Sequence, residues 1–319
     1  MNFRPLNIFF EKFSKTCGVH RNIVYLQAKN WTNLNTNIMK NIVVGIDFSQ
    51  NSENALRHAV ALALKSNAIV HVVWVKTPTA STKLDVSNEE EMMHKANEKL
   101  NELVKWARAE APKAQIQPVI LEGKAYVKLT QYAANLPEGI LVVGSHGASG
   151  FEEMFIGSNT MKVVGVTKVP VLIIGHQVNV KRDLTKILVP IDMSFETLQK
   201  IKPAAHFATL FSAKISLLGL CDPKYPDERH TIGVQLNHAA GMCDVANVRY
   251  DAATLEVNGD VPTAVVDWAK KEDVNMIVIM REDEDDITSF WLGSTTRQLM
   301  NQAPMPLLVI PNVMHSPIA

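Results

Sequence analysis

The sequence has no excess charge of either sign. Lys and Arg together number 32, as do Asp and Glu, so the formal net charge is zero. Binding to nucleic acid or to an anionic membrane surface relies on an excess of basic residues. The balance removes the electrostatic argument for either partner, and we expect neither nucleic acid nor membrane among the partners.

Cysteines are few, and long hydrophobic runs are missing. Cys17, Cys221 and Cys243 show neither paired spacing nor the spacing of zinc ligands, so no disulfide framework or metal site is indicated. No apolar run approaches the roughly 18 residues that cross a bilayer. With 47% hydrophobic residues among 319, the chain can fill two cores of ordinary domain size. We expect a cytoplasmic protein.

One glycine-rich loop stands out. It runs from Gly144 through Gly147 to Gly157 and Ser158, between an apolar run at 140–143 and a helical pattern. Glycine lets the backbone approach a ligand closely and adopt positive φ. A loop that leads into a helix N-terminus presents several N–H groups to one point, which is how backbone holds phosphate. The spacing Gly-x2-Gly-x9-Gly-Ser matches neither the dinucleotide fingerprint nor a Walker loop.

Short apolar strands alternate with helical patterns around this loop. Strands are predicted at 41–47, 69–75, 115–121, 140–144 and 169–174, and helices after 49, at 88–110 behind a capping box at 87–90, at 125–135 and from 158. Alternation of this kind predicts an α/β fold with a parallel, doubly wound sheet. Ligands of such sheets bind at the carboxyl ends of the strands, where Asp47, Val75 and Gly144 fall.

The same pattern then occurs a second time. Lys186–Asp192 mirrors Lys40–Asp47, and Gly293-Ser294 mirrors Gly157-Ser158. A repeat of about 140 residues has the size of one domain, so the chain is predicted to hold two tandem domains of one fold. We place the first domain at 39–178 and the second at 183–313, after an N-terminal extension at 1–38.

The second repeat lacks the glycine loop. The spacing puts Met280 in place of Gly144 and Asp283 in place of Gly147, and five carboxylates lie at 282–286. Such a loop would repel a triphosphate. A metal could bridge these carboxylates to phosphate, but an acidic run is more often a solvated face. We therefore predict one active nucleotide site and one degenerate copy.

From Met39 onward the chain resembles the universal stress protein family in its tandem form, with the ATP-binding type of loop in the first repeat. The resemblance implies a Rossmann-like fold of the adenine nucleotide alpha hydrolase-like kind. It also implies ATP as ligand, with Mg²⁺ or Mn²⁺. Asp47 and the backbone of Val75 would hold the adenosine end. The phosphate-binding residues would be Gly144, Gly147, Gly157, Ser158 and the amide of Asn159.

Family members commonly dimerise through the last strand of the domain. The strands 169–174 and 305–310 would therefore pair within this chain as a pseudo-dimer, and a further homodimer is possible. An apolar edge strand also needs such a cover.

Several of these residues have a simpler interpretation. Asp47 could cap the following helix, Ser158 could be a plain N-cap, and His146 could shape the turn. The tryptophans at 74, 106, 268 and 291 are expected to pack in the core. No base, arginine finger or Walker lysine is evident, so we assign no catalytic residue and expect a nucleotide-dependent switch in the stress response with little or no hydrolysis. The alternatives are an interaction protein that binds no nucleotide, or a slow ATPase.

Residues 1–38 are rich in Asn and have no signal-peptide core. One interpretation is an upstream extension from a misassigned start codon, which we would expect to be poorly ordered. The other is an amphipathic anchor or partner segment near 8–13.

Overall fold

The computed structural model describes residues 39–80, 84, 88–145, 156–175, 178, 183–194, 196–281 and 293–312. The N-terminal extension, His146, Gly147 and the acidic run at 282–286 lie outside these residues. By its internal contacts, Ile38–Ala319 forms one compact unit.

The first repeat alternates strands and helices as predicted. Its elements are β1 (Asn41–Ile46), α3 (Gln50–Ser66), β2 (Ile69–Lys76), α5 (Glu89–Glu110), β3 (Ile116–Glu122), α6 (Ala125–Ala134), β4 (Gly139–Gly144), α7 (Ser158–Val166) and β5 (Val171–Ile174).

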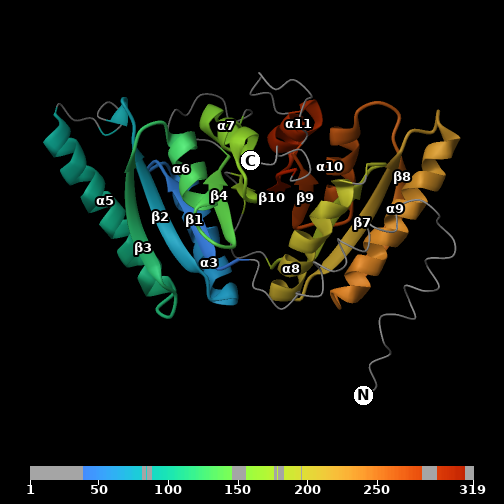
Figure 1. The fold of residues 1–319 in the computed structure, drawn as a ribbon, viewed down its shortest axis with the longest axis horizontal. Coiled ribbons are helices and arrows are strands. Elements are labelled where there is room, and N and C mark those ends of the chain that lie inside the picture. Colours follow the sequence, from blue (N-terminus) through green and yellow to red (C-terminus); the bar gives the residue numbers. More distant parts are fainter. Residues whose placement is uncertain are drawn as a thin grey trace, which may run out of the picture. The chain divides into compact units, whose positions relative to one another are not determined.

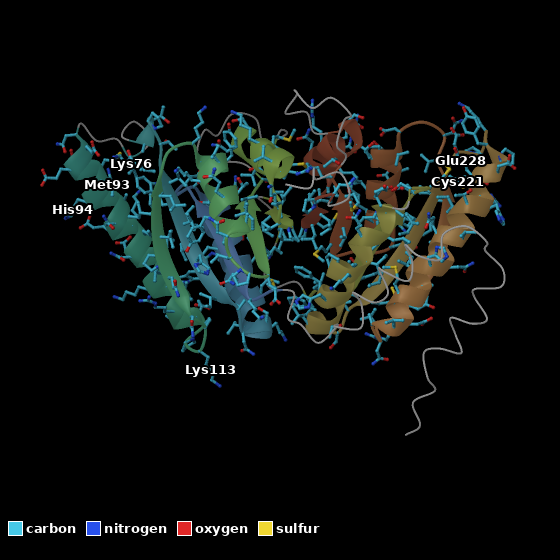
Figure 2. The ribbon with its side chains drawn as sticks, in the orientation of Figure 1. Lys76, Met93, His94, Lys113, Cys221 and Glu228 are labelled. Atoms are coloured by element: carbon cyan, nitrogen blue, oxygen red, sulfur yellow. The ribbon has the colours of Figure 1, made fainter. Side chains whose placement is uncertain are left out.

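The second repeat follows the same order, except that its first helix starts with a 3₁₀ turn. Its elements are β6 (Lys186–Ile191), η1 (Glu196–Lys200), α8 (Ile201–Phe211), β7 (Lys214–Cys221), α9 (Pro226–Val245), β8 (Tyr250–Glu256), α10 (Val261–Lys271), β9 (Met276–Met280), α11 (Ser294–Gln302) and β10 (Leu307–Ile310). Lys76 ends β2 and Cys221 ends the equivalent β7, and both lie at the upper edge of Figure 2.

All these strands belong to one sheet in the order β3-β2-β1-β4-β5-β10-β9-β6-β7-β8, which can be followed in Figure 1. Within each repeat the strands are parallel. Strand order reverses between β1 and β4, so the crossovers place α3 and α5 on one face and α6 and α7 on the other. The prediction of an α/β fold with two tandem doubly wound units is confirmed.

The two repeats meet through their last strands. β5 and β10 pair antiparallel, with Leu308 opposite Leu172 and Val309 opposite Val171. All residues of both strands are buried. The pairing covers two apolar edges that would otherwise template aggregation, and it confirms the predicted pseudo-dimer of the two repeats.

Helix starts show where local sequence reasoning succeeds and where it fails. Ser49 caps α3 as predicted, because its side chain accepts from the Ser52 amide. The capping box predicted from Ser87 is wrong, since Asn88 is the N-cap of α5 and accepts from the Glu91 amide at 2.8 Å. Ser158 is likewise not an N-cap, because Gly157 takes that position at α7.

Within the described residues, no helix is both long and apolar enough to cross a membrane.

Candidate functional site

A cavity of about 130 Å³ opens at the carboxyl ends of β1, β2 and β4, beside the point where strand order reverses. Six of the seven residues predicted to bind nucleotide line it. They are Asp47, Val75, Gly144, Gly157, Ser158 and Asn159. The seventh, Gly147, lies outside the described residues. The position follows from the fold, because parallel strands bring their carboxyl ends to one edge.

Asp47 follows β1 and is held by its own turn. Its Oδ1 accepts from the Ser49 amide at 3.1 Å and from the Ser49 hydroxyl at 2.6 Å. Ser49 in turn caps α3. Asp47 is therefore not the helix cap itself, but it orients Ser49, which is the cap. Asp47 also lines the cavity.

The N-terminus of α7 faces the same cavity. The Gly157 amide donates to Ser145 O at 2.8 Å, and the first helical bond runs from the Met161 amide to Gly157 O. The amides of Ser158, Asn159 and Thr160 have no hydrogen-bond partner within the described residues, and no side chain caps the helix. Three N–H groups and the positive end of the helix dipole can thus reach an anionic group.

Gly144 serves packing rather than backbone freedom. A Cβ at this position would lie 2.9 Å from the carbonyl carbon and oxygen of Asn51, in the first turn of α3. Neither Gly144 nor Gly157 has positive φ, and φ of Gly157 is −60°. The positive φ that glycine permits is therefore not used at these two positions, and Gly144 is required by the close approach of α3 to β4.

Among the residues that line the cavity, Phe48 has left-handed backbone, with a φ of 62°. This conformation costs a bulky residue energy and often marks a functional site. It places the Phe48 ring 5.9 Å from the Trp74 ring, and both side chains line the cavity. Trp74 is buried as expected, and its side chain also forms a wall of the cavity. Sequence reasoning missed Phe48 because no motif marks a positive φ in a non-glycine residue.

The apolar part of the cavity is completed by side chains from β4, α6 and α7. They include Ala125, Leu129, Val143 and Val163. An apolar slot next to a carboxylate and a row of N–H groups suits a flat heterocycle linked to an anionic tail.

No group of three or more His, Cys, Asp or Glu side chains that could hold a metal occurs in the described parts of the chain.

In the second repeat, a lysine reaches the equivalent aspartate. Asp192 keeps the turn, because its Oδ1 accepts from the Ser194 amide at 2.8 Å. Lys200, only 3% exposed, donates to Pro190 O at 2.6 Å and lies 3.8 Å from Asp192 Oδ2. Burial raises the pKa of Asp192, but Lys200 and hydrogen bonds from Ser194 and Thr197 outweigh it, so the pKa lies below its usual value. At the position of Lys200 the first repeat has buried Ala55.

The second repeat is packed differently at the position of Trp74. Gly219 of β7 corresponds to Trp74, and a Cβ there would lie 2.4 Å from Ile232 and 2.9 Å from Leu236 of α9. Gln235 of the same helix donates to Met193 O at 3.4 Å, next to Asp192. α9 therefore packs directly over the end of β7, where the first repeat has the buried Trp74 side chain that forms one wall of its cavity.

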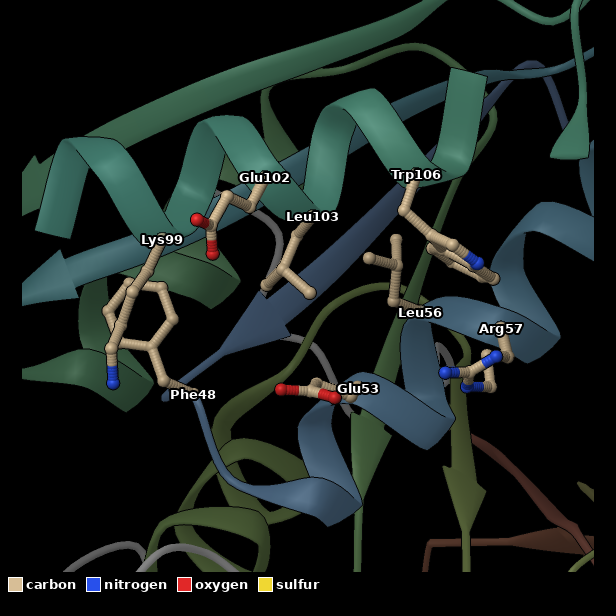
Figure 3. Close-up of a pocket in the computed structure, with 8 residues that line it drawn as sticks. All are labelled: Phe48, Glu53, Leu56, Arg57, Lys99, Glu102, Leu103 and Trp106. Atoms are coloured by element: carbon tan, nitrogen blue, oxygen red, sulfur yellow. The ribbon is translucent and has the colours of Figure 1, made fainter. Parts of the chain in front are cut away.

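A second hollow of about 330 Å³ lies between α3 and α5, on the far side of Phe48 (Figure 3). Its cations lie over aromatic rings: Arg57 is 4.6 Å from the Trp106 ring centroid, and Lys99 is 5.5 Å from that of Phe48. Its lining also includes Glu53 and Glu102, so the charges are mixed. Among the described residues its lining contains no glycine, and Glu53 occupies the first turn of α3 with a negative charge, so we do not assign the hollow a function.

Comparison with known proteins gives a consistent picture. The sequence model described as the universal stress protein family matches residues 39–175 and again 184–311. Universal stress protein A of Salmonella typhi is 30% identical over 139 residues, which is 39% of this chain and 92% of the relative. A universal stress protein from Archaeoglobus fulgidus has the same fold, with a TM-score of 0.67 at 18% identity over 86% of this chain and 98% of that one.

Proposed function

This chain belongs to the universal stress protein family, and we propose that its first repeat binds ATP and acts as a nucleotide-dependent switch in the stress response. The second repeat binds no nucleotide and serves as the structural partner of the first. The observation that carries the proposal is the single cavity that joins the Asp47 carboxylate, an apolar slot and the first-turn amides of α7.

Each part of the cavity matches one part of the ligand. The slot between Trp74 and Leu129 accepts the adenine ring, and Asp47 together with the backbone of Val75 accepts its hydrogen-bond donors or those of the ribose. The N-terminus of α7, with Gly157, Ser158 and Asn159, receives the phosphates. Gly147 completes the phosphate loop by its place in the sequence. Mg²⁺ or Mn²⁺ would neutralise phosphate charge when bound.

Hydrolysis is slow or absent in this proposal. The cavity lining within the described residues contains no Lys, Arg or His, so no such side chain is placed there to stabilise charge on the γ-phosphate. Backbone amides bind ground state and transition state alike, which gives affinity without acceleration. ATP therefore acts by ordering the loop that it touches.

Mass spectrometry of the supernatant after denaturation tests which nucleotide co-purifies with the protein. We expect ATP from the native chain and none from Gly147→Val, since a β-branched side chain would block the phosphate approach. Gly233→Ala, on α9 with open space around it, is the matched glycine control and should retain ATP. A native protein that carries no nucleotide and binds none in a titration would leave the alternative of an interaction protein without a ligand. A cytoplasmic location and a further homodimer stay predictions.

A further inference from the structure

The second repeat holds the phosphate-binding helix of the first repeat at both ends. At the N-terminal end, Asn301 Oδ1 of α11 accepts from the Ile156 amide at 2.9 Å, immediately before Gly157. At the C-terminal end, the Arg281 guanidinium donates to Thr167 O at 2.8 Å and to Val164 O at 3.4 Å. α7 and α11 lie next to each other where the repeats meet (Figure 1).

The side chains that make these contacts have no equivalents in the first repeat. The repeats align by Gly293 with Gly157 and by Thr296 with Thr160, whose hydroxyls donate to Met280 O and Gly144 O in the same way. In that alignment the first repeat has Gly165 in place of Asn301 and Ser145 in place of Arg281. Glycine has no side chain to reach α11.

The remaining pair, Ser145 and Arg281, differs in reach and charge. A serine hydroxyl carries no positive charge and extends one atom beyond Cβ, whereas a guanidinium spans the distance to a neighbouring helix. Both interactions therefore use side chains that only the second repeat carries at these positions. The asymmetry favours the repeat that keeps the glycine loop.

We propose that Asn301 and Arg281 are positioning residues through which the degenerate repeat sets the phosphate affinity of the first; this rests on the proposed function. α7 has only nine residues and no side-chain cap, so its own helical hydrogen bonds contribute little to holding its first turn in place. Asn301 fixes the backbone that enters the helix, and Arg281 places positive charge at its C-terminal carbonyls, which suits the helix dipole. The amides of Ser158 and Asn159 are thereby aimed into the cavity before ligand arrives.

The proposal separates phosphate from adenosine. Without these contacts the start of α7 has to become ordered when phosphate binds, which lowers the affinity for phosphate. The Trp74 and Val75 side of the slot belongs to β2 and does not depend on α7, although Val163 of α7 lines the same cavity. For Asn301→Ala and Arg281→Gln we expect ATP affinity to fall by about threefold to tenfold each, the effect of one or two hydrogen bonds. Adenosine affinity should stay within about twofold of the native value.

Matched controls come from the same chain. Arg249 donates to Ser212 O at 2.8 Å, at the C-cap of α8, so Arg249→Gln removes an equivalent arginine–carbonyl bond away from α7. Asn97→Ala removes an exposed side-chain bond to Met93 O on α5. Both control variants should bind ATP as the native protein does. Equal losses of ATP and adenosine affinity in Arg281→Gln, or equal effects in Arg249→Gln, would show a merely structural role and overturn the proposal.

Hydrogen exchange in the absence of nucleotide gives an independent readout. Amides at 156–163 should exchange about threefold to tenfold faster in Asn301→Ala and Arg281→Gln than in the native protein, with no change in α5. Unchanged exchange at α7 would refute the positioning function even if ATP binds. A native chain that does not bind ATP would instead refute the proposed function, while the exchange result still decides whether these residues hold α7.

Discussion

Gly144→Ala is the sharpest test of how the site is assembled. The added Cβ would lie 2.9 Å from Asn51 C and O and 3.1 Å from Asn51 Cβ, all too close for van der Waals contact. The obstacle is backbone in the first turn of α3, which the Ser49 cap holds in place. Either α3 or the end of β4 must move, and overpacking of this kind costs about 1–3 kcal/mol.

Because α3 and β4 both border the cavity, the shift should also weaken ATP binding. A displacement that costs about 1.4 kcal/mol of binding free energy lowers affinity about tenfold. Urea denaturation with and without ATP measures both effects. The matched control is Gly165→Ala in α7, where an added Cβ meets nothing within 4 Å and helix propensity should raise stability by up to about 1 kcal/mol.

The result that would refute this reasoning is a Gly144→Ala protein with the urea midpoint of the native chain and unchanged ATP affinity.

The second repeat shows how the fold accommodates a side chain at the position of Gly144. Met280 has a Cβ at the equivalent position, and the helix opposite begins with the 3₁₀ turn Glu196–Lys200 instead of an α-helical turn.

Four further outcomes are expected. Gly219→Ala should lower the urea midpoint by the equivalent of about 1–3 kcal/mol, whereas Gly233→Ala in α9, with open space around it, should raise it; equal shifts would contradict the tight packing of α9 on β7. Burial lowers the pKa of His71, so its contribution to stability is complete above a pH of about 6.5 and is lost as pH falls below that value. His71→Gln should therefore flatten the dependence of the urea midpoint on pH between about 7 and 5, and a curve parallel to that of the native protein would rule this out. Lys200→Ala should leave the ATP count per chain unchanged, because α9 still occupies the space at Gly219; a newly gained site, seen by titration, would refute that. Phosphate release should stay far below the roughly 1–100 s⁻¹ typical of kinases, and metal-dependent turnover in that range would make the protein an enzyme.

The fold was predictable because its signals are local. Buried parallel strands are short apolar runs, and the structure has them within about two residues of the predicted ranges, as at β4 (Gly139–Gly144), predicted at 140–144. The repeat in the sequence predicted the second unit. The pairing of the strands at 169–174 and 305–310 was implied by the resemblance to the family and supported by their apolar character. The strands and the repeat need only neighbouring residues or a comparison of the two copies, whereas the pairing also needed the family resemblance.

The parts that sequence reasoning missed depend on contacts between distant segments. Gly144 looks like a glycine chosen for φ, and only the position of Asn51 shows that the space is needed instead. Lys200 reads as an ordinary surface lysine of an amphipathic helix until it is found buried beside Asp192. The contact of Asn301 with Ile156 spans 145 residues and carries no local pattern.

Isothermal titration of the full chain with ATP decides most directly whether one repeat binds and the other does not. The first repeat has a cavity walled by Trp74, whereas in the second repeat α9 packs on Gly219 and Lys200 lies 3.8 Å from Asp192. This difference predicts about one ATP per chain. The same titration of Gly147→Val should show no binding. Two equivalent sites per chain, or undiminished binding in Gly147→Val, would contradict the assignment of the site to the first repeat.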